Sequence, residues 1–388
     1  MRVGLVTGIF PPDIGGPATF IPALGAGLVE RGHAVEVVTF SDSARATGGW
    51  PFPVRRIGRA SRLRHVRAVG AILRMAQRSD VLFVNGLVEA AMLANRFARR
   101  PCVVKVVGDS AWERARNRGL TAQAFTAFQE KRHPGVIACW QRRRNAALRR
   151  ATVVTVPSEF LRTVVESWGI GRPVRVIPNG VDESFVHAAE TAVAEAANLD
   201  EARRAHNLPA RFLLYAGRLT NWKGCDTLIR ALPELPEDVA LVIVGDGPEL
   251  KALVGITGRQ KLVERVRFLP PVGRTALAAL MRAAACVVLN SGYEGQPHVL
   301  LEAMAVGAPV AAAAECGTPE LVRDGENGLL FEKDNAPQIR DALRRVLDDA
   351  ALRRRLIAGG LATAVRYPWS ATLDRTEKLL MELAGRQS

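Results

Sequence analysis

Short runs of β-branched and apolar residues alternate with longer amphipathic stretches along the chain, and this alternation constrains the fold more than any other feature. A first series of runs occupies residues 3–7, 34–40, 81–85, 103–107 and 152–156. A second series occupies residues 212–216, 241–244, 266–269, 286–289 and 310–313. Runs of this length between amphipathic stretches are typical of βαβ units, so each series predicts a parallel sheet.

A polar segment rich in Ala and Glu, from Asp182 to about residue 210, separates the two series and predicts a hinge. The chain has 388 residues, enough for two domains that each bury a core. We therefore expect an α/β protein with two Rossmann-like domains, residues 1–183 and 184–366, that face each other across a cleft. Residues 367–388 begin with Tyr367-Pro368-Trp369 and predict a separate terminal helix.

The composition is that of a water-soluble globular protein, with 48% hydrophobic and 23% charged residues. No apolar run approaches the roughly 20 residues that a bilayer span requires. Residues 1–10 lack a basic leader and continue into the first predicted strand, so we expect a cytoplasmic protein. The five cysteines form no Cys-x-x-Cys pair, which predicts reduced thiols, mostly in the core, and neither a disulfide framework nor a zinc site.

The formal net charge is +15, and the excess is concentrated in one region. Between Arg55 and Arg150 there are 22 basic residues and only five acidic ones. A basic face including the run 141–144 fits an anionic acceptor, or the anionic inner face of a membrane on which the protein would be peripheral. A solvated surface is the alternative. No helix-turn-helix, zinc-finger or ribonucleoprotein pattern accompanies the charge, so no nucleic acid is expected.

The loop after the first predicted strand ends in Gly15-Gly16, directly before an apolar helix. Glycines there permit a close backbone approach, and the free N–H groups of a helix start attract phosphate. A tight strand-to-helix turn is the alternative. Gly25-Ala26-Gly27 lies in the middle of the same helix and predicts close helix packing, not a dinucleotide fingerprint.

In the second half, Arg218 and Lys223 lie in the loop after the run 212–216, with Gly217 and Gly224 beside them. Ligands bind at such carboxyl ends of parallel strands. Two fixed cations there can neutralise a departing diphosphate. No Asp-x-Asp accompanies them, so no bound metal is expected.

The segment 290–305 contains two glutamates, Glu294 and Glu302. Pro297 suits a first helical position, which would leave residues 293–296 as a loop at a positive helix end. Glu294 would then lie beside a sugar. Glu302 would lie about 7 to 8 Å along the helix, near ribose hydroxyls, with a capping or surface acid as the alternative. Its neighbours are apolar, so an unpartnered carboxylate there would be costly.

These residues resemble glycosyltransferase family 4, whose members have the GT-B fold. Glu294 and Glu302 match the family's signature of two glutamates separated by seven residues. The other matching motifs follow the family's order from end to end: Gly16, Pro157-Ser158, 177–182, 217–224, 245–248 and 317–322.

The resemblance implies a retaining, metal-independent enzyme whose donor is a nucleoside diphosphate sugar, with no other cofactor. Arg218 and Lys223 would hold the diphosphate, and Glu302 would bind the ribose. The remaining donor contacts would come from Gly16, Gly217, Glu294, Gly295, Gln296 and Pro297. His298 would lie close to the donor, with a helix-face histidine in a structural hydrogen bond as the alternative. The terminal helix would cross back onto the first domain.

One departure concerns the run 105–113. Many relatives have a histidine in a Val-His-Gly-Asp-like run, whereas here the run begins Lys105-Val106-Val107-Gly108-Asp109. Asp109 would bind sugar hydroxyls or take the acceptor proton, with its acidity tuned by Lys105, unless it caps the next helix. Trp112 would stack on a sugar unless it is a core residue, and His133 lies in the basic, acceptor-side region.

Together these features predict a retaining glycosyltransferase that uses a UDP-sugar in preference to GDP-mannose. The acceptor would be a hydroxyl compound, lipid-linked or anionic, in cell-surface glycan, glycolipid or natural-product assembly. The alternatives are a catalytically idle scaffold that binds sugar nucleotides or membranes, and a nucleotide-sugar epimerase.

Overall fold

The computed structural model describes residues 1–13, 15–42, 49–187 and 208–385. Their contacts divide the chain into two units. The first unit contains the described residues of 1–123, 127–178 and 371–385, and the second contains those of 124–126 and 179–370. The expected boundaries at 183/184 and 366/367 lie within a few residues of these. Most of the expected hinge falls in 188–207, outside the described residues.

The first unit is built on a seven-stranded parallel sheet with the order β3-β2-β1-β4-β5-β6-β7. Its strands are β1 (Arg2–Thr7), β2 (Ala34–Phe40), β3 (Val54–Ile57), β4 (Val81–Asn85), β5 (Cys102–Lys105), β6 (Val153–Val156) and β7 (Val174–Val176). All five predicted strands are confirmed, although β5 ends at Lys105, before the predicted end. We did not predict β3 and β7. They are short edge strands with partly exposed residues, and so lack the continuous apolar run of a buried strand.

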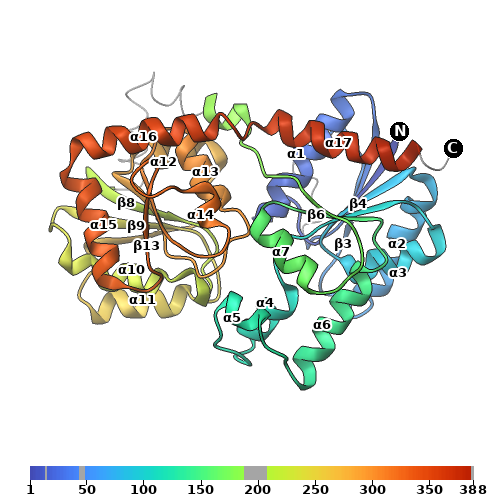
Figure 1. The fold of residues 1–388 in the computed structure, drawn as a ribbon, viewed down its shortest axis with the longest axis horizontal. Helices are drawn as coiled ribbons and strands as arrows, with labels where there is room; N and C mark the ends of the chain where they lie inside the picture. Colours follow the sequence, from blue (N-terminus) through green and yellow to red (C-terminus); the bar gives the residue numbers. More distant parts are fainter. Residues whose placement is uncertain (14, 43–48, 188–207, 386–388) are drawn as a thin grey trace. The chain divides into compact units, whose positions relative to one another are not determined.

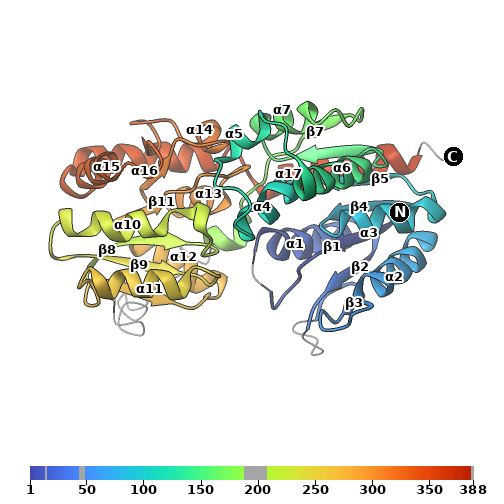
Figure 2. The same ribbon diagram turned by 90° about the horizontal axis from the view of Figure 1, so that it is seen from below.

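Helices cover the first sheet, and Figure 2 shows α2 and α3 side by side. In chain order the helices of this part of the chain are α1 (Gly16–Glu30), α2 (Arg64–Arg78), α3 (Val88–Ala98), α4 (Ser110–Asn117), α5 (Phe125–Gln129), α6 (Gly135–Leu148) and α7 (Glu159–Ser167). The first two residues of α5 belong to the second unit. A Cβ at Gly25 of α1 would lie 2.6 Å from the ring of Phe52, and one at Gly27 would lie 2.5 Å from Leu373. The helix-packing interpretation of these glycines is therefore confirmed.

The last helix, α17 (Trp369–Gly385), runs beside α1 (Figure 1), and its residues from 371 onward belong to the first unit. Arg31 forms ion pairs of 2.6 Å with Asp374 and Glu377, and His33 Nε2 lies 2.7 Å from Glu377. Partial burial opposes ionisation of Glu377, but the hydrogen bonds from His33 and Arg31 outweigh it and lower the pKa of Glu377. The terminal helix thus packs on the first unit, as the family resemblance implied.

The second unit is built on a six-stranded parallel sheet with the order β10-β9-β8-β11-β12-β13. Its strands are β8 (Arg211–Ala216), β9 (Val239–Val244), β10 (Val266–Leu269), β11 (Cys286–Leu289), β12 (Val310–Ala313) and β13 (Leu329–Phe331). The five predicted strands are confirmed, and only the three-residue β13 was not predicted.

The helices of the second unit are η1 (Asn221–Lys223), α10 (Cys225–Ala231), η2 (Leu232–Glu234), α11 (Leu250–Arg259), α12 (Arg274–Ala283), α13 (His298–Ala305), α14 (Thr318–Leu321), α15 (Ala336–Asp348) and α16 (Ala350–Ala364). In both sheets the strand order reverses at a central pair, β1 with β4 and β8 with β11. Ligands of such sheets bind outside the carboxyl ends of the strands near this reversal.

The cysteines are free, as predicted. Cys102, Cys225 and Cys286 are buried, and burial raises the pKa values of the last two to about 12. None of the described helices is both long and apolar enough to cross a bilayer.

Candidate active site

The loops after β8 and β9 approach each other closely at the carboxyl edge of the second sheet. Gly217 follows β8 with φ +154°, and Gly245 follows β9 with φ +152°. A Cβ at Gly245 would lie 2.0 Å from the carbonyl oxygen of Gly217, so only glycine fits there. This approach fixes the start of the segment that carries Arg218 and Lys223.

Lys223 and Glu294 form the charged centre of this edge. Lys223 ends η1, Glu294 lies in the loop after β11, and the ammonium forms an ion pair with the carboxylate. Only 18% of the Lys223 side chain and 15% of the Glu294 side chain are exposed. The structure therefore brings together a predicted phosphate ligand and a predicted sugar ligand, and each neutralises the other.

Asn290, directly after β11, holds the Lys223 segment in place. Its Nδ2 donates hydrogen bonds to the carbonyl of Gly224 at 3.0 Å and to Asp334 Oδ1 at 2.8 Å, and its Oδ1 accepts one from the Asp334 backbone N–H at 3.0 Å. Asn290 is fully buried. Its position between the strand end and Glu294 could have indicated a site residue in the sequence. Its role could not be predicted, because its partners lie far away along the chain.

Glu302, the fifth residue of α13, has Arg274 as its partner. Arg274 Nη1 lies 3.3 Å from Glu302 Oε1, and 16% of the Glu302 side chain is exposed. Burial raises the pKa of Glu302, although Arg274 opposes the shift. The guanidinium of Arg274 also lies 4.8 Å from the ring centroid of Phe185. The expectation that this acid is not left unpartnered is confirmed, and Arg274 is a candidate site residue that we did not predict.

The other residues predicted to bind the donor in this unit differ in their exposure and in the hydrogen bonds they already make. Arg218 is exposed. Gln296 is buried and binds the backbone of Asn179, accepting from its N–H at 2.6 Å and donating to its carbonyl at 3.4 Å, so its amide is occupied by protein. Pro297 is the N-cap residue with φ −75°, and α13 begins at His298. Our prediction of Pro297 at the first helical position was wrong by one residue, because the proline ring is compatible with φ at either position.

Gly295 and Gly317 bring two further loops together, because a Cβ at Gly317 would lie 2.2 Å from the carbonyl oxygen of Gly295. The described residues include no group of three or more His, Cys, Asp or Glu side chains that could hold a metal ion.

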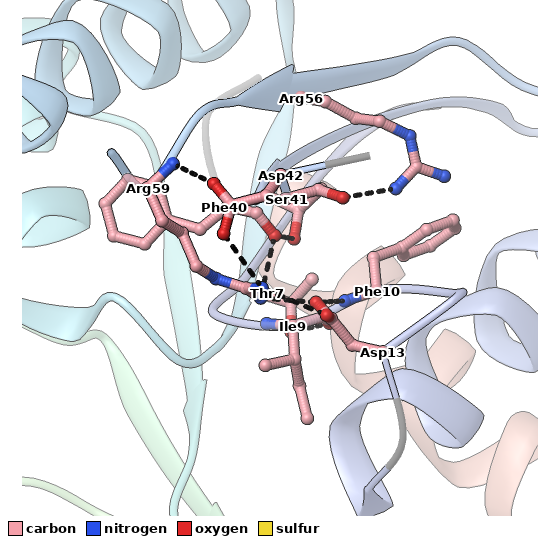
Figure 3. Close-up of polar contacts among 10 residues, drawn as sticks. Thr7, Ile9, Phe10, Asp13, Phe40, Ser41, Asp42, Arg56 and Arg59 are labelled. Atoms are coloured by element: carbon pink, nitrogen blue, oxygen red, sulfur yellow. Dashed lines mark hydrogen bonds and ion pairs between the residues drawn. The ribbon is translucent and has the colours of Figure 1, made fainter. Parts of the chain in front are cut away.

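At the carboxyl edge of the first sheet, ion pairs fasten the Gly-Gly loop (Figure 3). Asp13 pairs with Arg59, whose Nη2 also donates to the carbonyl of Phe40 at 3.3 Å. Thr7 Oγ1 donates to the carbonyl of Ile9 at 2.9 Å. The loop thus reaches the start of α1 at Gly16 with its first half tied to the segments that follow β2 and β3.

Asp109 is fully buried and has three partners. Its Oδ1 accepts from the Ala111 N–H at 2.8 Å and lies 2.5 Å from Arg144 Nη1, and Gln129 Nε2 donates to its Oδ2 at 3.0 Å. The helix-capping alternative is therefore confirmed, and a role in the reaction stays a prediction. Lys105 is not among these partners. Arg144, which we had placed on a basic face, is instead buried with its guanidinium 3.5 Å from the ring centroid of Trp168.

The two acceptor-side candidates are packed locally. Trp112 is 1% exposed, and its Nε1 donates to the carbonyl of Gln123 at 3.1 Å, which agrees with the core-packing alternative. His133 stacks on Phe128 with ring centroids 3.9 Å apart, and its Nε2 lies 2.9 Å from the Phe128 carbonyl oxygen.

Two Rossmann-like units form the GT-B architecture, and two glycosyltransferase family models match the chain. "Glycosyltransferase Family 4" matches residues 14–185, and "Glycosyl transferases group 1" matches residues 198–362. The chain belongs to the GT-B glycosyltransferases that combine these two domains.

Among curated proteins, the chain is similar to the D-inositol 3-phosphate glycosyltransferase of Thermomonospora curvata, with 35% identity over 58% of this chain and 55% of the relative. It is also similar to the phosphatidyl-myo-inositol mannosyltransferase of Mycobacterium tuberculosis, with 29% identity over 99% of this chain and 98% of the relative. The chain spans about half the length of the first relatives that it matches.

Two solved structures share the fold over nearly all of both chains. The sucrose-phosphate synthase of Thermosynechococcus elongatus has a TM-score of 0.79 at 22% identity and covers 99% of each chain. The Anabaena protein HepE, in complex with UDP and glucose, has a TM-score of 0.77 at 21% identity over 99% of this chain and 100% of its own. These likenesses show the fold.

Proposed function

We propose that the chain is a retaining glycosyltransferase that moves a sugar from a nucleoside diphosphate donor to a hydroxyl acceptor without a bound metal. The observation that carries the proposal is the ion pair of Lys223 with Glu294 at the carboxyl edge of the second sheet. It combines a cation suited to a diphosphate with an acid suited to sugar hydroxyls. The exposed Arg218 supplies a second cation on the same loop.

The names of the relatives support the choice of substrates. A structural neighbour binds UDP and glucose, so we favour a UDP-sugar over GDP-mannose as the donor, although one relative is named a mannosyltransferase. Two relatives are named for inositol phosphate and for phosphatidylinositol. We therefore favour an anionic or lipid-linked hydroxyl acceptor, as in glycolipid, cell-surface glycan or natural-product assembly.

Donor binding in this proposal is an exchange of partners. The diphosphate takes the place of Glu294 beside Lys223, which frees the carboxylate to accept hydrogen bonds from the sugar hydroxyls. Glu302 likewise accepts a hydrogen bond from the ribose, while Arg274 turns toward solvent or the nucleotide. The cations then stabilise the charge that develops on the diphosphate as the anomeric bond breaks.

The acceptor hydroxyl attacks the face from which the diphosphate departs, and the departing phosphate oxygen takes its proton. Glu294 orients the sugar in this step and forms no covalent bond to it. This assignment follows from the exchange of partners described above, in which the freed carboxylate accepts hydrogen bonds from the sugar hydroxyls.

A thermal-shift panel of nucleoside diphosphate sugars identifies the donor, because a ligand selective for the folded state raises the melting temperature. Release of nucleoside diphosphate, first without and then with added acceptors, tests turnover. Release accompanied by a glycosylated product with retained anomeric configuration supports the proposal. Binding with neither hydrolysis nor transfer would favour the idle scaffold, and an epimeric sugar nucleotide without free nucleotide would favour the epimerase.

We also propose that the basic region binds an anionic surface. Near the start of α2, the exposed apolar side chains of Leu63 and Val66 lie beside the exposed Arg64 and Arg67, a combination suited to a charged membrane interface. Cosedimentation with anionic vesicles should weaken as salt rises. Equal recovery with neutral vesicles would contradict the membrane proposal.

A further inference from the structure

A line of polar side chains crosses the carboxyl edge of the first sheet. The pairing of the parallel strands aligns Thr39 with Thr7, Thr7 with Asn85, and Lys105 with Thr155. Val84 pairs with Val104, so the next residues of those strands, Asn85 and Lys105, lie side by side. Aligned residues of parallel strands point to the same face of a sheet. We call Thr39, Thr7, Asn85, Lys105 and Thr155 the polar row.

The polar row lies on the face of the sheet that α1 covers. Phe20 of α1 stacks on Phe83, with ring centroids 6.0 Å apart, and Phe83 shares its face with Asn85, two residues further along β4. Lys105 Nζ lies 4.2 Å from the centroid of the same Phe20 ring. Every member of the row is buried, with at most 4% of its surface exposed.

Two members of the polar row lack the partners that buried polar groups normally have. Thr7 and Thr39 donate to backbone carbonyls, but Thr155 Oγ1 has no hydrogen-bond partner within the described part of the chain. No carboxylate pairs with Lys105 among the described residues. The strands β1, β4 and β6 contain no acid, and the first turn of α1 has none.

The contact of Lys105 with Phe20 only partly compensates for the lost hydration of a buried ammonium. Burial lowers the pKa of Lys105 to about 7. The nearest acid along the chain, Asp109, is already bound by Arg144. Lys105 therefore has no counter-charge among the described residues. A bound anionic ligand could supply one.

Two glycines without side chains lie at the edge beside the row, where the strand order reverses between β1 and β4. Gly8 follows β1, and a Cβ built on it would meet no atom within 4 Å. Gly86 follows β4 with φ +122°, and a Cβ there would lie 2.6 Å from the Gly8 nitrogen. Parallel sheets bind ligands at this kind of reversal, so the open edge and the incomplete row point to the same place.

We propose that the polar row binds a phosphate group of the acceptor, with Lys105 as its charge partner and Asn85 and Thr155 as hydrogen-bonding partners. The inference rests on the proposed function and narrows it to acceptors that carry both a hydroxyl and a phosphate. The surplus of basic residues between Arg55 and Arg150 draws such anions toward the unit. Lys105 then selects phosphorylated acceptors over uncharged ones.

The binding test compares Lys105→Met with Lys378→Met, which removes an exposed lysine of α17 in the same unit. Inorganic phosphate is titrated against each variant and the wild type, and its affinity is obtained from the rise in melting temperature. We expect Lys105→Met to weaken the phosphate affinity by about tenfold or more, the loss typical of a charge-assisted hydrogen bond, and Lys378→Met to leave it unchanged. Equal phosphate responses in the two variants would overturn the proposal.

Stability without ligand separates binding from a structural role. Lysine keeps its proton to about pH 10 in the unfolded chain but only to about pH 7 in the folded protein, so the buried charge costs stability below pH 7. We expect Lys105→Met to melt at or above the wild-type temperature at pH 6, with the difference shrinking as pH rises from 7 to 10. A lower melting temperature across this range would show that Lys105 supports the fold, and would overturn the proposal.

Thr155→Val provides an independent variant, because valine has nearly the same size as threonine. It tests phosphate binding by the polar row even if Lys105→Met does not fold. We expect its phosphate affinity to fall severalfold without loss of stability, because the hydroxyl it removes has no partner among the residues that the structure describes. An unchanged phosphate affinity would overturn the assignment.

Transfer assays with inositol 3-phosphate, phosphatidylinositol vesicles and myo-inositol distinguish a free phosphorylated acceptor from a lipid-linked one. The Michaelis constant of whichever phosphorylated acceptor is used should rise about tenfold in Lys105→Met. Equal use of myo-inositol by the wild type would contradict the selectivity. If the wild type neither transfers sugar nor hydrolyses any donor, the proposed function fails, whereas the phosphate titration still decides whether the row binds an anion.

Discussion

At the carboxyl edge of the second sheet, Lys223 pairs with Glu294 and Arg274 with Glu302, whereas at the edge of the first sheet Lys105 has no acidic partner among the described residues. The first edge does contain acids, but Arg144 and a helix N-terminus occupy Asp109, and Arg59 pairs with Asp13. The two sheets share a parallel topology and a reversal of strand order. Their edges therefore differ in how charge is balanced before any ligand arrives.

This difference has a consequence for binding. A cation that is already paired must exchange its partner. At Lys223 the binding free energy of a diphosphate is therefore only the difference between its interaction with Lys223 and that of Glu294. Lys105 is buried and has no acidic partner among the described residues, so an anionic ligand would supply its whole counter-charge without displacing another group. We therefore expect ligand selectivity in the second unit to depend on how well a ligand replaces the existing ion-pair partners. In the first unit, we expect ligand affinity to depend chiefly on whether the ligand is charged.

The largest expected effect tests whether Asp109 is structural. Asp109→Ala leaves Arg144 as a buried charge without its acid, and we expect a loss of about 3–5 kcal/mol in the free energy of unfolding, measured by urea denaturation. Glu89→Ala is the matched control, because it breaks the exposed pair with Arg143, the neighbour of Arg144. That change should cost less than about 1 kcal/mol. A stable Asp109→Ala protein that has lost only turnover would restore the catalytic prediction.

The next effect concerns the exchange at Lys223. Lys223→Ala should lower kcat by about 10²-fold or more, the loss typical of removing one group that stabilises transition-state charge. Arg218→Ala should act in the same direction. The control is Lys251→Ala, which removes an exposed lysine of α11. Unchanged turnover in both loop variants would remove the cationic site from the mechanism.

Glu302→Gln tests whether Glu302 binds the donor or, like Asp109, supports the fold. We expect the donor Michaelis constant to rise about tenfold with kcat less affected, since a hydrogen bond to a charged acceptor is lost. The folded-state pKa of Glu302 is raised, so its ionisation costs stability once pH rises above the unfolded value of about 4.3. The variant should therefore match the wild type near pH 3 and be at least as stable at pH 7. A marked loss of stability at pH 7 would make Glu302 structural like Asp109.

The smallest effect involves a pair that lies on neither edge. Glu377→Gln weakens the contacts of α17 with Arg31 and His33, and should cost about 0.5–1 kcal/mol at pH 7 by urea denaturation. The pKa of Glu377 is lowered on folding, so its contribution is complete above pH of about 4.3 and is lost as pH falls through the folded value. A cost that persists at pH 2 would have to come from packing.

Much of the fold follows from sequence because the central strands are continuous buried runs, such as Val239–Val244. The edge strand Val174–Val176 escaped prediction because it is short and half exposed. At the site, Lys223, Glu294 and Glu302 could be selected from their loops and spacing. Their partners could not, because the pairing of Arg274 with Glu302 depends on how α12 lies against α13.

The sequence was least informative about which charges are buried. Arg144 belongs to a run of three arginines that indicates a solvated face, yet a single turn of α6 directs it toward Asp109 and Trp168. Lys105 ends a short apolar strand, where a polar residue normally marks the transition to solvent. Only the alignment of Lys105 with Thr155 and the position of Phe20 show that it lies under a helix.

The assignment of α17 to the first unit has a consequence for biosynthesis. Because the ribosome delivers residues in order, the second unit emerges complete while the first still lacks the helix that Arg31 and His33 anchor. The first unit would then complete its folding only after the second. Until α17 emerges, the surface around Gly27 that receives Leu373 stays uncovered.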